Sequence, residues 1–146
     1  MGTGTESGGK AAPDRRKRNG RQAMIRGIGL DLCEVARMVP RAEDERFLKR
    51  YFTEAEAAYV RKRGRSAGQS LAGLFAAKEA FAKALGTGIA FELREVEIIH
   101  DAEGCPAYRL SGRAAELAGS DRFLLSISHD GGMAGAVCVR ESPAEG

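Results

Sequence analysis

The segment from Leu71 to Leu85 constrains the fold of this chain more than any other. Its apolar side chains recur at helical spacing and share one face, namely Leu71, Leu74, Phe75, Phe81, Ala82 and Leu85. Gly86-Thr87-Gly88 follows at once, and a glycine directly after an apolar stripe is typical of a helix end. The pattern predicts one long helix whose apolar face is buried in a core.

Alternating apolar residues predict strands on both sides of this helix. In the run from Gly27 to Leu32, apolar residues alternate with glycine and aspartate. Turn sequences at 101–104 and 130–132 join the later strands in pairs, so neighbouring strands should be antiparallel. Those later strand patterns lie at 96–98, 108–110, 123–129 and 133–140. The expected class is α+β, a single compact domain with an antiparallel sheet and one long central helix.

Shorter helices are expected between these elements. Thr53 and Glu56 have the spacing of a capping box, so a helix should begin after Thr53 and end near Gly64. Pro40 should stop a short helix that begins near Val35. Further short helices are expected at 47–52 and 112–119, and a polar loop at 64–70.

Most of the basic character of the chain lies in residues 1–23. They carry six basic and two acidic residues, a net charge of +4, whereas the whole chain carries +3, so residues 24–146 carry −1. Because it has few large apolar residues, 1–23 is expected to be a disordered leader before a domain at 24–146. The run Arg15-Arg16-Lys17-Arg18 could bind nucleic acid or anionic lipid, but a solvated tail is favoured. The nearly neutral domain lacks the positive field of a nucleic-acid binder.

The other composition features exclude several classes. Three widely spaced cysteines and two histidines give no support to a zinc site. An odd number of cysteines without a signal-peptide pattern favours the cytoplasm. No apolar run approaches the roughly 20 residues that span a bilayer.

Asp31 is the first candidate metal ligand. It ends the first predicted strand on the face shared with Gly27 and Gly29, and these glycines leave room for something bulky. A hard cation such as Mg²⁺ prefers carboxylate oxygen. The alternative is that Asp31 caps a helix starting at Cys33. Judged from Asp31 alone, the helix cap is favoured over the metal ligand.

Three charged residues of the long helix form a second candidate cluster. Lys78 falls inside the apolar stripe, where its ammonium should either snorkel to water or reach an anion. Glu79 and Lys83 lie one turn apart at the border of the stripe, which fits a simple ion pair. The set also suits a metal-bridged phosphate, with Glu79 on the metal, the lysines on the phosphates and the glycines of 86–88 allowing close backbone approach.

The two histidines carry weaker signals. His129 ends the strand predicted at 123–129, where a lone histidine is more often a packed or rim residue than a catalytic group. His100 stands just before a turn and is expected at the surface.

Three segments together resemble the holo-acyl-carrier-protein synthase family of phosphopantetheinyl transferases. The middle segment contains both K-E-A-x-x-K and G-T-G-I and is specific, and the order and spacing of all three also fit. The resemblance covers about Met24 to Glu141 and does not include the leader. The segments are Gly27-Ile28-Gly29-Leu30-Asp31-Leu32, the run FAAKEAFAKALGTGI at 75–89, and Ser126-Ile127-Ser128-His129.

The resemblance implies a fold and a reaction. The fold would be that of 4′-phosphopantetheinyl transferases. The reaction would move 4′-phosphopantetheine from coenzyme A to a serine of apo acyl carrier protein, release 3′,5′-ADP, and serve fatty-acid or polyketide synthesis. Mg²⁺ would be the cofactor and would bridge the pyrophosphate of coenzyme A. The family typically forms homotrimers with active sites between subunits.

The resemblance also implies roles for individual residues. Asp31 and Glu79 would be the Mg²⁺ ligands, and Glu79 and Lys83 the catalytic residues. Coenzyme A would contact Lys78, Lys83, Gly86, Thr87 and His129. The acidic carrier protein would meet Arg37, Arg46 and Arg50.

The sequence departs from the family at three positions, namely Leu74, Cys105 in a turn where Gly-Lys-Pro is common, and Asp130 where a threonine or glutamate is often seen. Leu74 stands where the family commonly has an arginine, which affects the contacts expected at the nucleotide end of coenzyme A.

Two rival functions are possible for this chain. An Mg²⁺-dependent phosphohydrolase would use the same carboxylates with water, but it needs no basic docking surface such as 37–50 offers. A binding module acting through the leader is the other rival, and the nearly neutral domain argues against it.

Overall fold

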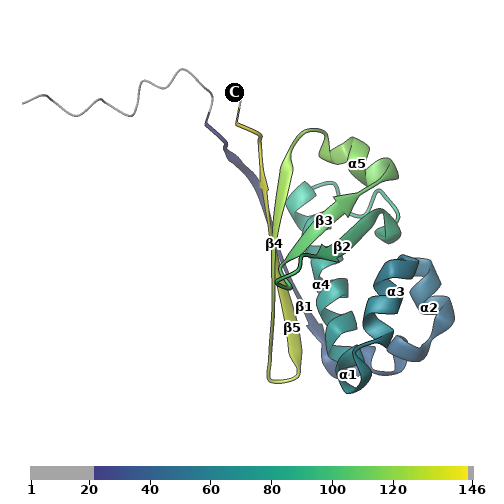
Figure 1. Cartoon of the computed structure of the whole chain (residues 1–146). Coiled ribbons are helices and arrows are strands. Elements are labelled where there is room, and N and C mark those ends of the chain that lie inside the picture. The colour runs from purple at the N-terminus through teal and green to yellow at the C-terminus, as the bar shows by residue number, and fades with distance from the viewer. Residues whose placement is uncertain (1–21, 145–146) are drawn as a thin grey trace, which may run out of the picture.

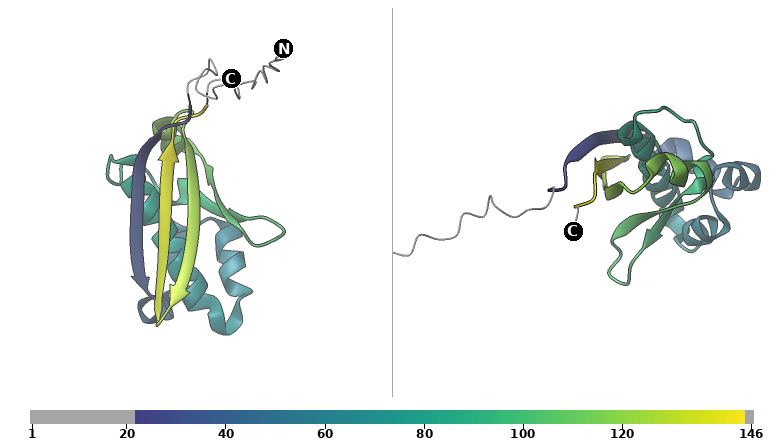
Figure 2. Two further views of the ribbon diagram at one scale, coloured as in Figure 1. Left: turned by 90° about the vertical axis from the view of Figure 1, so that its left-hand side faces the viewer. Right: turned by 90° about the horizontal axis from the view of Figure 1, so that it is seen from above.

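Three antiparallel strands lie along one side of the long helix α4 (Figure 1). The computed structural model describes residues 22–144. β1 (Ile25–Glu34), β5 (Met133–Glu141) and β4 (Arg122–Asp130) form a sheet in the order β1-β5-β4, and α4 (Ala67–Leu85) packs mainly on β1 and β5. Figure 2 shows the three strands side by side with the helices on one face of the sheet.

A second, two-stranded sheet pairs β2 (Val96–His100) with β3 (Pro106–Leu110). The turn between them is closed by Asp101, whose Oδ1 accepts hydrogen bonds from the backbone N–H groups of Glu103 and Cys105. Every strand pair is antiparallel, as predicted, and the α+β class is confirmed. The described strands nevertheless divide into two sheets, whereas the sequence was expected to give one.

Short helices connect β1 to α4. The predicted capping box at the start of α3 is present, because Thr53 Oγ1 accepts from Glu56 N and Glu56 Oε1 accepts from Thr53 N. Beyond α4, a 3-10 helix (Leu93–Glu95) precedes β2, and α5 (Gly112–Ala118) joins β3 to β4. The elements between β1 and α4 are α1 (Val35–Met38), a 3-10 helix (Pro40–Glu43), α2 (Glu45–Tyr51), α3 (Glu54–Arg61) and a 3-10 helix (Gly64–Ser66).

The start of α4 differs from the prediction. The helix begins at Ala67, so the loop expected at 64–70 is wrong from Ala67 onward. A Cβ on Gly68 would lie 2.7 Å from Cγ2 of Val39, so the glycine allows this first turn to pack closely on the segment after α1. This tertiary contact outweighs the weak helix propensity of glycine and serine. At the other end, Gly86 adopts the predicted left-handed cap with a φ of 82°.

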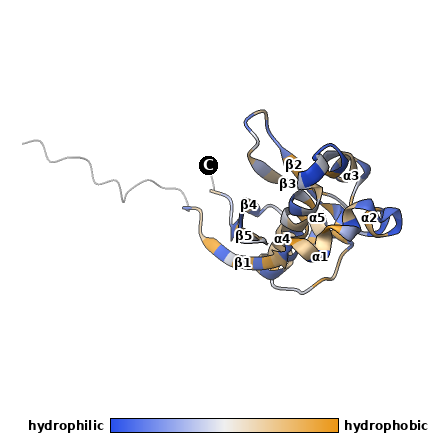
Figure 3. Cartoon of the chain, turned by 90° about the horizontal axis from the view of Figure 1, so that it is seen from below, coloured by the Kyte–Doolittle hydropathy of each residue, from blue (hydrophilic) through white to orange (hydrophobic). Residues whose placement is uncertain are grey.

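The face of the large sheet that points away from α4 is apolar. Ile28, Leu30 and Leu32 on β1 are each at least 60% exposed, and Leu124 on β4 is 54% exposed. Figure 3 shows hydrophobic segments along β1 on the outside of the chain. An exposed apolar face of this kind indicates an interaction surface. Within the described residues, no helix combines the length and hydropathy that a membrane crossing requires.

Candidate active site

Two glycines of β1 bring the strand into direct contact with the backbone of α4. A Cβ on Gly29 would lie 1.9 Å from the carbonyl oxygen of Ala80, and one on Gly27 would lie 2.1 Å from that of Ala84. Real Cβ atoms do not approach backbone this closely, so only glycine fits at either position. The expectation that these glycines leave room for a bulky group is therefore wrong, because the helix itself fills the space.

This close packing places Asp31 beside the last two turns of α4. Lys83 Nζ donates to Asp31 Oδ1 at 3.0 Å and to the carbonyl oxygen of Leu30 at 2.9 Å. The alternative role of Asp31 as a helix cap is wrong, because α1 begins at Val35 and its N-cap residue is Glu34. The side chain of Asp31 is thus directed at the helix that carries the other charged candidates.

Glu79 completes an acidic pair at this place. Burial raises the pKa of the Glu79 carboxyl, and the nearby charge of Asp31 raises it further, while Lys83 and Arg37 act in the opposite direction. The cation of Lys83 bonds to Asp31, so the simple ion pair between Glu79 and Lys83 is not the contact observed. Two carboxylates from a strand and a helix, with mutual repulsion, form an oxygen donor set that fits a hard divalent cation. We call Asp31, Glu79 and Lys83 the acidic-pair cluster.

Lys78 does not join this cluster. Its side chain is fully buried, and Nζ donates to Glu56 Oε1 at 2.8 Å and to the carbonyl oxygens of Leu93 and Val96 at 2.9 and 2.7 Å. An ammonium group has three donors, and all three are used inside the protein. The expected contact of Lys78 with coenzyme A does not fit this geometry, and neither does snorkelling to water.

The glycine-rich turn after α4 is open. Gly86 and Gly88 have φ values of 82° and 70°, and no heavy atom would lie within 4 Å of a Cβ on either. The hydroxyl of Thr87 donates to the carbonyl oxygen of Gly88. The turn therefore offers accessible backbone near Lys83, and the predicted contacts of Gly86 and Thr87 with phosphate remain predictions.

His129 lies elsewhere, at the end of β4 on the opposite edge of the sheet from β1. Its Nε2 is 3.2 Å from the carbonyl oxygen of Gln69, and it lines a pocket of about 160 Å³. Tyr59, Arg63 and His100 line the same pocket. The His100 ring stacks on Tyr59 at 4.4 Å between centroids, and the Arg63 guanidinium lies 5.3 Å from the Tyr59 centroid. We call this the His129 pocket.

The His129 pocket and the acidic-pair cluster are separate within one chain. Gly73 packs beside His129 and stands six residues before Glu79, which is about 9 Å along the helix axis. Leu74, where the family commonly has an arginine, also lines the pocket. His100 was expected at the surface, but it is half-buried, and burial followed by the charge of Arg63 lowers its pKa. Sequence reasoning missed Arg63, which has no distinctive spacing.

Three predicted docking arginines lie on one basic surface with a fourth. Arg46 and Arg50 line a shallow hollow of about 510 Å³ together with Arg41, which sequence reasoning missed. The guanidinium of Arg41 lies 5.1 Å from the Phe47 ring centroid, and that of Arg37 on α1 lies 5.8 Å from the ring of Phe75. The charges of Arg37, Arg41, Arg46 and Arg50 form what we call the arginine surface. Counting every cation between 37 and 50 would have found Arg41.

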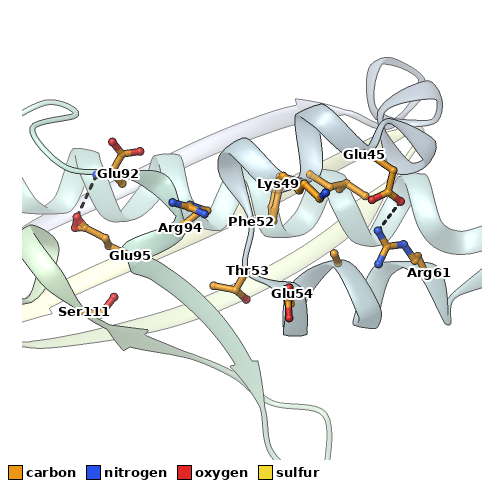
Figure 4. A pocket seen from close by; sticks show the side chains of 12 residues that line it. Glu45, Lys49, Phe52, Thr53, Glu54, Arg61, Glu92, Arg94, Glu95 and Ser111 are labelled. Carbon is orange, nitrogen blue, oxygen red and sulfur yellow. Dashed lines mark hydrogen bonds and ion pairs between the residues drawn. The ribbon is translucent and has the colours of Figure 1, made fainter.

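Another cavity contains none of the predicted site residues. It measures about 820 Å³ and lies between α2, α3 and the 3-10 helix at Leu93–Glu95 (Figure 4). Its charged residues are of both signs, and Arg61 pairs with Glu45 at 2.6 Å.

Comparisons with known proteins identify the family of the chain. The model of the 4′-phosphopantetheinyl transferase superfamily matches residues 27–130, the stretch that holds the acidic-pair cluster and His129. The holo-[acyl-carrier-protein] synthase of Caldicellulosiruptor saccharolyticus is 42% identical over 121 residues, which covers 81% of this chain and 98% of that protein. The corresponding protein of Treponema denticola is 40% identical over 122 residues, covering 81% and 99%.

Solved structures give the same result. The holo-[acyl-carrier-protein] synthase of Neisseria meningitidis has a TM-score of 0.71 and 36% identity, covering 82% of this chain and 100% of that one. The Bacillus anthracis protein in complex with coenzyme A (3′,5′-ADP) has a TM-score of 0.70 and 35% identity, covering 82% and 99%. By sequence and by fold, this chain belongs to the 4′-phosphopantetheinyl transferase superfamily, among the holo-[acyl-carrier-protein] synthases.

Proposed function

We propose that this protein transfers the 4′-phosphopantetheine group from coenzyme A to a serine of an apo acyl carrier protein and releases 3′,5′-ADP. The observation that carries the proposal is the acidic-pair cluster. Asp31 on β1 and the pair of Glu79 and Lys83 on α4 meet although about fifty residues separate them in sequence. Relatives named as holo-[acyl-carrier-protein] synthases cover most of the chain and support the same reaction.

Asp31 and Glu79 are the residues that would hold Mg²⁺. Both offer carboxylate oxygen, and the raised pKa of Glu79 reflects a crowding of negative charge that a cation relieves. When bound, Mg²⁺ would neutralise charge on the pyrophosphate of coenzyme A during phosphoryl transfer. The carboxylates keep this charge-neutralising centre at the junction of β1 and α4.

The chain itself supplies the positioning groups and the cation of Lys83. The serine hydroxyl of the carrier protein attacks the β-phosphate of coenzyme A, the bond from that phosphorus to the bridging oxygen breaks, and 3′,5′-ADP leaves. Lys83 donates to the departing phosphate, where negative charge increases in the transition state. The serine proton would pass to Glu79 or to a water molecule at the site. Gly86 and Thr87 present the adjoining backbone to the same phosphates.

The nucleotide end of coenzyme A would bind at the His129 pocket. Arg63 and His129 line it from different elements, so a phosphate there meets a cation although Leu74 replaces the arginine common in the family. Because this pocket and the acidic-pair cluster occupy opposite edges of one sheet, a complete site needs residues from two copies. The apolar outer face of Ile28, Leu30 and Leu32 supports association into a homotrimer with active sites between subunits.

The arginine surface would bind the carrier protein. Its charges stand on α1, on the 3-10 helix at Pro40–Glu43 and on α2, and Arg37 is near enough to Glu79 to lower its pKa, so an acidic partner docked there would bring its serine toward the phosphates. The reaction belongs to the cytoplasm and to lipid synthesis, or to an equivalent polyketide pathway. The domain that performs it spans 24–146, and the leader proposed at 1–23 lies almost entirely outside the described residues.

Mass spectrometry of an apo carrier protein tests the proposal directly. After incubation with this protein, coenzyme A and Mg²⁺, the carrier should gain one phosphopantetheine group on its serine. The same protein with Asp31→Ala serves as the control and should leave the carrier unmodified. Release of phosphopantetheine without any modified carrier would instead indicate the rival phosphohydrolase.

A further inference from the structure

Lys78 and Glu56 are the only charged residues that are fully buried within residues 22–144. Besides accepting from Lys78, the Glu56 carboxylate accepts from Thr53 N at 3.0 Å and from Ile98 N at 3.1 Å. No buried side-chain nitrogen or oxygen of the described part lacks a partner. The pair therefore joins four elements through short, complete hydrogen bonds: α3, α4, β2 and the 3-10 helix at Leu93–Glu95.

The pair acts on the turn of α4 that carries Glu79. Lys78 is its immediate neighbour, and the carbonyl oxygen of Ala77 accepts from the hydroxyl of Tyr108 at 2.6 Å. Ala80 directly follows Glu79, and its backbone packs against Gly29 of β1. This turn is thus held by α3 and the β2–β3 sheet on one side and by β1 on another.

Stability alone is a weak explanation for such a pair. Buried ion pairs often stabilise a fold no better than apolar residues of the same size, because both charges lose their hydration. What they fix well is orientation. A rotation of α4 by about 10° moves a side-chain tip some 5–6 Å from the axis by about 1 Å. Functional constellations tolerate only about 0.5 Å.

We propose that Glu56 and Lys78 are positioning residues for Glu79. They fix the rotation of α4 so that the Glu79 carboxylate faces Asp31, and the hydroxyl of Tyr108 fixes the same turn by a second route. The inference rests on the proposed role of Asp31 and Glu79 as metal ligands. It assigns Lys78 no contact with coenzyme A.

Binding of Mn²⁺ alone, followed by electron paramagnetic resonance in protein without coenzyme A, tests this role. Lys78→Met keeps the length of the side chain and removes its charge, and it should weaken Mn²⁺ binding about tenfold or more. Tyr108→Phe removes one hydroxyl only and should weaken binding in the same direction by less. Because Tyr108→Phe changes so little, it decides the matter if Lys78→Met does not fold.

Two controls separate positioning from stability and from the metal assignment. Leu48→Ala, a core substitution in α2, should lower the melting temperature and leave Mn²⁺ affinity unchanged. Asp31→Ala should abolish binding. Raised Mg²⁺ should restore part of the transfer rate in Lys78→Met and none in Asp31→Ala.

The outcomes are distinguishable. Wild-type Mn²⁺ affinity in Tyr108→Phe, and in Lys78→Met where it folds, would overturn the positioning role and leave the metal centre standing. Failure of the wild-type protein to bind Mn²⁺ would overturn the metal centre itself, and the positioning role with it. If Leu48→Ala lost as much Mn²⁺ affinity as Lys78→Met, the loss would be explained by general destabilisation, and the inference would be contradicted.

Discussion

Gly29 and Ala80 are in backbone contact, so close that a Cβ on the glycine would lie 1.9 Å from the alanine carbonyl oxygen. This contact between β1 and α4 sets where the carboxylate of Asp31 meets the helix that carries Glu79 and Lys83. The geometry of the acidic-pair cluster therefore depends on the absence of a side chain at Gly29.

Gly29→Ala should damage both stability and activity. The new methyl group must push the helix backbone away, which we expect to lower the free energy of unfolding by about 1–3 kcal/mol or more. Because that shift separates Asp31 from Lys83, activity should fall further than the loss of folded protein explains. Urea denaturation and transfer assays below the transition would measure both effects.

Gly135→Ala is the matched control for that substitution. Gly135 lies in β5 of the same sheet, but the nearest heavy atom to its Cβ would be the flexible end of Leu32 at 3.1 Å. It should cost less stability than Gly29→Ala, and because Leu32 belongs to the face proposed for subunit association, the two substitutions are compared by stability alone. Equal effects of the two alanines would contradict the importance of the contact with α4.

Lys83→Ala should lower kcat more than it raises KM for coenzyme A. In the proposed reaction its ammonium, which pairs with Asp31, meets charge that develops on the departing phosphate, so a loss of about 100-fold or more is expected. Lys83→Arg keeps the charge with a different donor geometry and should recover part of the rate. Lys62→Ala, an exposed lysine after α3, is the control. An unchanged kcat in Lys83→Ala would show that Lys83 has no catalytic role and is an ordinary surface residue of the helix.

Arg46→Glu and Arg50→Glu should raise KM for the carrier protein far more than KM for coenzyme A. Both side chains belong to the arginine surface, and charges at the rim of an interface act mainly on association. Added salt should shrink the effect, because it screens exposed charges. Arg113→Glu on α5 makes the same charge change away from this surface and should have little effect. Salt-independent losses, equal for both substrates, would rule out a docking role.

His100 should titrate below the range of an ordinary histidine. Burial and the charge of Arg63 both lower its pKa. Between the lowered pKa and the ordinary value, the unfolded chain binds a proton that the folded protein does not, so stability should rise as pH rises through this window. His100→Gln should remove that part of the pH dependence.

The pKa of His100, measured by NMR titration, also reports on ligand binding in the His129 pocket. Arg63→Gln should raise the pKa of His100, and 3′,5′-ADP should raise it too, because a phosphate in the pocket favours the charged imidazole. If neither Arg63→Gln nor 3′,5′-ADP changes the pKa of His100, the nucleotide end of coenzyme A binds elsewhere.

The sequence predicted the parts of the site that follow from local pattern. Asp31 at a strand end, Glu79 and Lys83 one turn apart, and the glycine cap at Gly86 are all read from spacing within single elements. The structure brings the first three together, as the family resemblance implied, whereas the local pattern of Asp31 alone favoured a helix cap. The fold class followed from the same periodicities.

The errors concern contacts between elements. Position on the helix placed Lys78 at the apolar face, but nothing local indicated that its partner would be Glu56, twenty-two residues earlier on another helix. In the same way, the sequence predicted free space beside the glycines of β1, whereas in the fold these glycines contact the backbone of α4. Arg63 joins His129 only through the packing of α3 on the rest of the chain. Pairings of this kind depend on tertiary structure and have no signature in a single segment.

We propose that Asp31 and Glu79 act together in one transfer reaction, and intact-mass analysis of a carrier protein tests this proposal. Wild-type protein with coenzyme A and Mg²⁺ should convert the carrier to its phosphopantetheine form. Asp31→Ala and Glu79→Ala should each retain the fold, by circular dichroism, and lose nearly all conversion, with no further loss in the double variant because both act on one centre. Near wild-type conversion by either folded single variant at ordinary Mg²⁺ would contradict the account.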